Sequence, residues 1–156
     1  MRSSFLDLTE DHDIKDSSRI ITVDGTWVDF GYGLYDNERP ILRDSHVIDL
    51  LSNPDHVDKQ KVKGIYLTGY KDITDESLVY ISKHFPQLER LQVSGCDLIT
   101  DAGIVAVAEK CHKLTHFSYS QCSKVTNEAP KAIVSNLPLL KYLSASHCNA
   151  TVINLG

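Results

Sequence analysis

The sequence predicts an α/β fold: a short solenoid with a parallel sheet on its concave face and helices on its convex face. The main observation is a pattern of about 26 residues that recurs along the chain, which is typical of stacked repeats. Each copy contains an apolar-x-x-apolar-x-apolar segment, and in the first three copies this is followed, at a constant distance, by a threonine that can start a helix. The copies open at Val62, Leu88, Leu114 and Leu140.

Each copy is predicted to begin with a strand. In Leu91-Gln92-Val93-Ser94 apolar and polar residues alternate, and this period of two places the apolar side chains on one face of a strand. One strand and one helix cannot bury their own apolar faces, so neighbouring copies must stack, with strands about 4.8 Å apart in a parallel sheet. Equivalent side chains of successive copies should therefore lie in rows.

A helix is predicted after each of the first three strands. Thr74, Thr100 and Thr126 are good N-cap candidates, because a threonine hydroxyl can accept a bond from a backbone N–H that the first turn leaves free. Apolar residues follow at helical spacing. They are Leu78, Ile81 and Phe85 in the first helix and Ile104, Val107 and Ala108 in the second. Pro130 is compatible with the third helix because it falls within the first turn.

Residues 1–61 do not follow the repeat. They are predicted to form an irregular N-terminal cap and an atypical first repeat, ahead of the repeats at 62–150 and a tail at 151–156. We expect a strand at 19–24, a helix at 44–51 and, between them, a loop rich in glycine and aromatic residues. The aromatic residues are Trp27, Phe30, Tyr32 and Tyr35. They could cover the end of the core, or they could form a partner-binding patch.

The composition is that of one folded domain, since 42% of the 156 residues are hydrophobic and 24% are charged. No apolar run approaches the roughly 20 residues of a membrane helix, and residues 1–13 lack the features of a secretory signal. We therefore expect no membrane insertion and a cytoplasmic or nuclear location. The net charge of −5 argues against nucleic acid as a partner, because phosphate binding needs a clustered basic surface.

The cysteines are predicted to be free thiols. Cys96, Cys122 and Cys148 share one slot of successive repeats, where a small thiol can donate weakly to a backbone carbonyl, so we expect them to be structural. Cys111 lies where the second helix joins the next strand. The alternative, a disulfide framework, is typical of short secreted chains.

No catalytic, metal or cofactor site is expected. The cysteines of the repeat face the core whereas His116 and His147 face outward, so they cannot meet in one tetrahedral site. The sequence has no nucleophile elbow, phosphate-binding glycine loop or H-E-x-x-H motif. We therefore predict that the chain is not an enzyme and takes no small-molecule substrate.

The segment 88–104, with Ile-Thr-Asp shortly after its cysteine, resembles the consensus of the cysteine-containing leucine-rich repeats found in many F-box proteins. The resemblance covers about residues 62 to 150. Tyr70 replaces the cysteine in the first copy, and Asn127 replaces the aspartate in the third. The resemblance implies a right-handed solenoid that binds other proteins and catalyses nothing.

Two functional interpretations of this resemblance remain open. Residues 1–61 contain no recognisable F-box, so only a recognition role carries over, as an adaptor or substrate-recognition component of the ubiquitin system. The alternative is an assembly or coupling subunit of a mitochondrial complex. The chain resembles in architecture the ATP synthase subunit s group, also called coupling factor B, which has a small N-terminal region followed by a few similar repeats.

The outward-facing positions of the strands are predicted to bind a protein partner, because they line up in rows on the concave face. The predicted set is Tyr66, Thr68, Arg90, Gln92, Ser94, His116, Ser118, Ser120, Tyr142 and His147. The large side chains among them are the candidate hot spots of binding. These are Tyr66, Arg90, His116 and Tyr142. The alternative is a solvated sheet face with no dedicated ligand.

Overall fold

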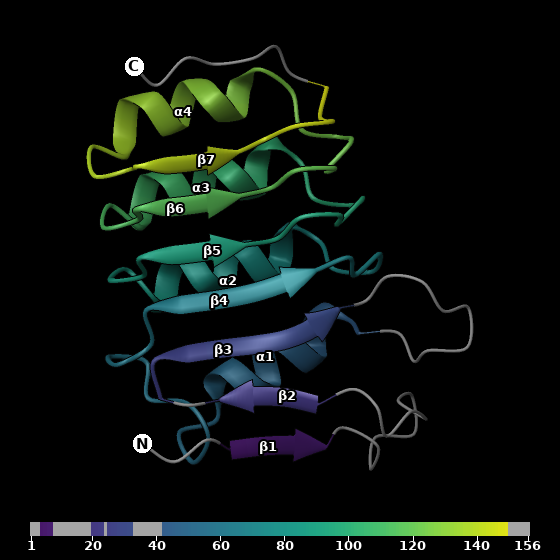
Figure 1. Ribbon diagram of the computed structural model, residues 1–156, viewed down its shortest axis with the longest axis vertical. Helices are drawn as coiled ribbons and strands as arrows, with labels where there is room; N and C mark the ends of the chain where they lie inside the picture. Colours follow the sequence, from purple (N-terminus) through teal and green to yellow (C-terminus); the bar gives the residue numbers. More distant parts are fainter. Residues whose placement is uncertain (1–3, 8–19, 24, 33–41, 150–156) are drawn as a thin grey trace.

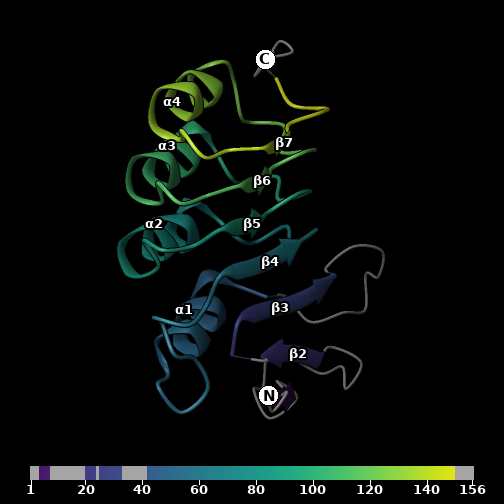
Figure 2. The same ribbon diagram turned by 60° about the vertical axis from the view of Figure 1, so that its left-hand side comes forward.

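The computed structural model describes residues 4–7, 20–23, 25–32 and 42–149. In this part of the chain a seven-stranded sheet, in the order β1 to β7, packs against four helices (Figure 1). The elements are β1 (Ser4–Asp7), β2 (Ile20–Val23), β3 (Trp27–Tyr32), α1 (Asp44–Ser52), β4 (Gly64–Thr68), α2 (Asp75–His84), β5 (Arg90–Gln92), α3 (Asp101–Lys110), β6 (His116–Ser118), α4 (Glu128–Asn136) and β7 (Tyr142–Ser144). The helices all cover one face of the sheet (Figure 2).

Strands β3 to β7 are parallel, and each is joined to the next by a helix on the same side of the sheet. The predicted fold, a short leucine-rich-repeat-like solenoid, is thereby confirmed. We call the face of the sheet away from the helices the open face. Its first row is Trp27, Gly64, Arg90, His116 and Tyr142, and its second row is Asp29, Tyr66, Gln92, Ser118 and Ser144.

The core lies between the sheet and the helices. Val62, Leu88 and Leu114 are fully buried at equivalent points of successive repeats, whereas Leu140 in the last repeat is half-buried. Every residue of the two predicted helical stripes is buried: Leu78, Ile81, Phe85, Ile104, Val107 and Ala108. Full burial of one large apolar side chain contributes roughly 1.5 to 3 kcal/mol. Stacking of repeats is therefore the main source of stability.

Two of the three predicted helix starts are confirmed. Thr74 and Thr100 are the N-caps of α2 and α3, and each hydroxyl accepts a bond from the backbone N–H two residues on. The prediction for Thr126 is wrong, because α4 has Asn127 as its N-cap. The cause is Pro130, which has no N–H to donate to the Thr126 carbonyl. The first helical bond is instead made by Lys131 to the Asn127 carbonyl, at 3.4 Å.

The predicted glycine-rich loop after residue 24 is wrong, because residues 27–32 form strand β3. Val28 and Phe30 are fully buried and alternate with the less buried Trp27, Asp29 and Gly31, and parallel pairing with β4 outweighs the low strand propensity of glycine. Gly31, with φ of 72°, lies where the register shifts beside β4.

The first repeat is therefore built from β3 and α1. The strand predicted at 19–24 is confirmed as β2, but it pairs antiparallel with β3 and lies outside the first repeat. Strand β1, which the sequence analysis did not predict, pairs antiparallel with β2. The helix predicted at 44–51 is confirmed as α1.

The aromatic residues of the N-terminal region lie in different parts of the structure. Phe30 is fully buried in the core, as a capping residue would be. Trp27 is half-buried on the open face, in the row that contains Arg90. The side chain of Tyr32, Tyr35, and the tail predicted at 151–156 lie outside the described residues.

Neighbouring helices are linked at their starts by a ladder of aspartates. The aspartate that begins α1, α2 or α3 accepts bonds from the backbone N–H and the hydroxyl of the threonine near the start of the next helix. The pairs are Asp44 with Thr74, Asp75 with Thr100, and Asp101 with Thr126. Asp44 also accepts from the amide and hydroxyl of Ser77, at 3.3 and 2.5 Å. Each carboxylate thus satisfies donors that a helix end leaves free.

The cysteine slot forms a second ladder, and its thiols are free, as predicted. Each thiol donates to a carbonyl of the preceding repeat: Cys96 to Leu67 at 3.8 Å, Cys122 to Val93 at 3.4 Å and Cys148 to Tyr119 at 3.2 Å. Burial raises the pKa of Cys96 to about 11 and that of Cys122 to about 12, so both remain protonated at neutral pH. Tyr70 takes this slot in the first copy, and its hydroxyl donates to the Phe30 carbonyl.

Tyr119 is fully buried, and its hydroxyl has no hydrogen-bond partner in the described part of the chain. Its ring packs edge-on against Phe117, with centroids 5.4 Å apart.

A buried polar group without a partner opposes folding, so we expect Tyr119→Phe to raise the free energy of unfolding by about 1 kcal/mol. Urea unfolding measures the change. The matched control is Tyr70→Phe, which removes a buried hydrogen bond and should lower stability by about 1 kcal/mol. Equal losses in both variants would show that the Tyr119 hydroxyl is satisfied.

Candidate functional site

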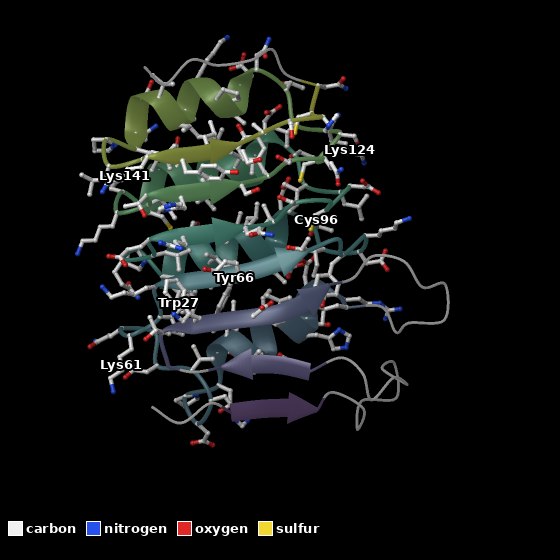
Figure 3. All side chains as sticks on the ribbon, in the orientation of Figure 1. Trp27, Lys61, Tyr66, Cys96, Lys124 and Lys141 are labelled. Carbon is white, nitrogen blue, oxygen red and sulfur yellow. The ribbon has the colours of Figure 1, made fainter. Side chains whose placement is uncertain are left out.

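The first row of the open face is irregular because Gly64 has no side chain. The indole of Trp27, one strand away, lies over Gly64 and occupies the space that a Cβ atom would need. Figure 3 shows Trp27 beside Tyr66, and their ring centroids are 6.0 Å apart. A side chain at residue 64 would displace the indole. The glycine therefore positions Trp27 against β4.

The remaining large side chains of the open face extend this cluster across the sheet. The guanidinium carbon of Arg90 lies 5.6 Å from the centre of the Trp27 ring, within range of a cation–π interaction. The rings of His116 and Tyr142 are 5.9 Å apart, and His116 Nδ1 lies 2.9 Å from the hydroxyl of Thr115. Aromatic and basic side chains from β3 to β7 thus form one continuous surface.

A hollow of about 120 Å³ lies in this surface, over strands β4 to β7. It is lined by Tyr66, Arg90, Leu91, Gln92, His116, Phe117, Ser118 and Tyr142. Six of these are predicted partner-binding residues, and Leu91 and Phe117 are core residues at its floor. The structure therefore brings together the large members of the predicted set.

The smaller members of the predicted set form a hydrogen-bonded ladder along the open face. In each pair a side chain near the end of one strand contacts a side chain of the next strand. The pairs are Thr68 with Gln92 at 2.9 Å, Ser94 with Ser118 at 2.6 Å, and Ser120 with Ser144 at 2.5 Å. These groups already have partners within the protein. We therefore expect a ligand to gain less from them than from the aromatic and basic residues.

His147 lies apart from the hollow, in the turn after β7. It is exposed, with φ of 58°, at the position that Gly69 and Gly95 occupy in earlier repeats. Trp27 was expected in a loop, as part of an end cap or of a partner-binding patch, and the structure places it on β3 in the first row of the open face. The signal was present, because Trp27-Val28-Asp29-Phe30 has the same period-two alternation as the later strands.

Residues 42–149 and the described strand segments before them contain no group of three or more His, Cys, Asp or Glu side chains that could hold a metal ion. The same part of the chain has no helix both long enough and apolar enough to cross a bilayer.

No protein-family model matches the sequence, and no curated protein matches it. Among solved structures, a chain from the crystal structure of the Rad7 and Elc1 complex in yeast has a similar fold, with a TM-score of 0.52 and 22% sequence identity. The likeness is one of fold alone. It covers 65% of the present chain and 26% of the other, so the present chain corresponds to about a quarter of that protein's length.

Proposed function

We propose that the chain is a non-catalytic recognition module that binds a protein partner through its open face. The observation that carries the proposal is the cluster of Trp27, Tyr66, Arg90, His116 and Tyr142 around the hollow. Tryptophan, tyrosine and arginine are the residue types that contribute most binding energy at protein interfaces. Their gathering on one face, with a floor of core residues, favours a binding surface over an ordinary solvated sheet.

The resemblance of the repeats to a known class supports a more specific role. The cysteine ladder and the capping threonines occupy the positions expected from the cysteine-containing leucine-rich repeats that the sequence resembles. The solved chain of similar fold belongs to a complex of two proteins. We infer an adaptor or substrate-recognition role in the ubiquitin system, in the cytoplasm or nucleus. A tagged chain located in mitochondria would instead favour an assembly subunit.

Replacement of Tyr142 by alanine tests the proposed surface. Tyr142 is 55% exposed, so the substitution should leave the fold intact while removing a hot-spot ring. We expect affinity for a captured partner to fall by about tenfold or more. The measurement is quantitative affinity purification with the tagged full chain from cells that express it, followed by titration of the purified partner.

The matched control is Val134→Ala, because Val134 is an apolar residue of α4, on the helix layer, that is 62% exposed. Its partners should be recovered as with the unmodified chain. Unchanged recovery of every partner by Tyr142→Ala and by Trp27→Ala would place binding elsewhere, and the proposal would fail.

A further inference from the structure

The hollow on the open face has room for one side chain of a partner. Its volume of about 120 Å³ is well below the roughly 300 to 1,000 Å³ of sites for free small molecules. In the order of the sheet, Tyr66 on β4 and Tyr142 on β7 flank Arg90 and His116. An inserted side chain would therefore meet aromatic walls at both ends and cationic or hydrogen-bonding groups between them.

Arg90 gives the hollow a positive charge that is not neutralised within the described part of the chain. Glu89, its neighbour in sequence, forms an ion pair with Lys63 at 3.4 Å instead. The guanidinium of Arg90 lies over the Trp27 ring and Arg90 is exposed, and the described part of the chain shows no hydrogen bond or ion pair of this guanidinium, so it can pair with an outside acceptor. Asp29, an acid in the second row of the open face, accepts a bond from the Gly31 amide of its own strand at 2.8 Å.

The charge around the hollow is unevenly distributed although the whole chain carries −5. The edge at which the parallel strands begin is rich in lysine, and the edge at which they end is rich in aspartate. The first edge carries Lys61, Lys63, Lys113 and Lys141, of which Lys61 pairs with Asp58 at 3.6 Å and Lys63 with Glu89 at 3.4 Å. The second edge carries Asp72, Asp75, Asp97 and Asp101, together with Lys71 and Lys124. Figure 3 shows Lys61 and Lys141 at the first edge and Lys124 at the second. Three residues of the hollow are the first residues of their strands and therefore lie toward the basic edge: Arg90, His116 and Tyr142.

We propose that the hollow receives a carboxylate side chain from an acidic segment of a partner protein. Arg90 pairs with the carboxylate, and the rings of Trp27, His116 and Tyr142 contact apolar residues beside it. Lys113 and Lys141 of the basic edge, which form no ion pair in the described part of the chain, attract the rest of the segment. This inference rests on the proposed function and adds the chemistry of the partner to it. A nucleic acid is less favoured, because phosphate binding needs many basic contacts and the opposite edge is acidic.

The test is selection of short random peptides, displayed on phage, against the full chain and its variants. We expect enrichment of peptides with Asp or Glu beside an apolar residue. Their affinity should fall by about tenfold or more in Arg90→Gln, because a charge-assisted bond is lost, and less in Arg90→Lys, which keeps the charge. Lys124→Gln, which removes a charge from the acidic edge, is the matched control and should bind like the unmodified chain.

Three results would overturn the inference. Selection of neutral or basic peptides that depend on Tyr142 would refute the acidic partner and leave the protein-binding function standing. Failure to select any peptide above the Tyr142→Ala background would refute the inference, and the affinity purification above would then decide the function separately. Binding of a fluorescent single-stranded RNA that Arg90→Gln abolishes would assign the surface to nucleic acid. Thermal unfolding of Arg90→Gln within the range of the parent ensures that a loss of binding is not a loss of fold.

Discussion

Replacement of Leu91 by alanine is expected to lower the free energy of unfolding by about 2 to 5 kcal/mol. Leu91 is 2% exposed on β5, in register with Ile65 and Phe117, and it lies beneath the hollow of the open face. The loss combines the transfer of the removed carbon atoms to water with the cavity left between the layers. A domain of this kind is stable by only about 5 to 15 kcal/mol, so a large fraction of the molecules could unfold. Chemical denaturation monitored by circular dichroism measures the change.

The matched control for Leu91→Ala is the same substitution at Leu139, which is 54% exposed after α4. It should lower stability by less than about 1 kcal/mol. If the two variants unfold at the same denaturant concentration, Leu91 does not occupy the core, and the register of β5 between β4 and β6 is incorrect.

Replacement of Asp44 by alanine should lower the free energy of unfolding by about 2 to 4 kcal/mol, because buried donors left without an acceptor destabilise by roughly 1 to 3 kcal/mol each. Asp44 is 8% exposed and accepts four hydrogen bonds, two from Thr74 and two from Ser77. These bonds join α1 to α2. We therefore expect the first repeat to exchange its amide hydrogens faster than the later repeats, which hydrogen exchange detects.

Two further variants show how much of the lost stability is due to the hydrogen bonds of Asp44, and how much to its charge or to the helix propensity of alanine. Asp44→Asn keeps one acceptor oxygen and should recover part of the stability. Asp49→Ala removes an exposed carboxylate from the same helix and should change stability by less than about 0.5 kcal/mol. A loss in Asp49→Ala as large as that in Asp44→Ala would show that the ladder contributes nothing.

The repeat, the strand register and the caps of α2 and α3 follow from the sequence because the interactions behind them are local or recur at a fixed period. Alternation identifies the buried face of β5, and a threonine hydroxyl caps its own helix within two residues. Four large side chains of the candidate site could be placed on one face for the same reason. The start of α4 was misplaced although its cause, the missing N–H of Pro130, is also local.

Other features depend on residues that are distant in sequence. Asp75, at the start of α2, accepts a hydrogen bond from Thr100, which is 25 residues away. The sequence of α2 alone does not indicate this partner. The indole of Trp27 reaches the open face because Gly64 on the next strand leaves it room. The period of the repeat contains a signal for part of the aspartate ladder, because Asp75 and Asp101 each follow a capping threonine and lie about one repeat before Thr100 and Thr126.

The sequence by itself determined that equivalent apolar residues stack and that polar rows line one face of a parallel sheet, because side-chain periodicity is a property of the backbone. Only the tertiary structure decided that residues 27–32 form the first parallel strand, that the serines of the open face satisfy one another, and that Arg90 lies against Trp27 without an acid partner in the described part of the chain. Each of these depends on which side chains neighbouring repeats bring within contact distance, and local propensity carries no information about that distance.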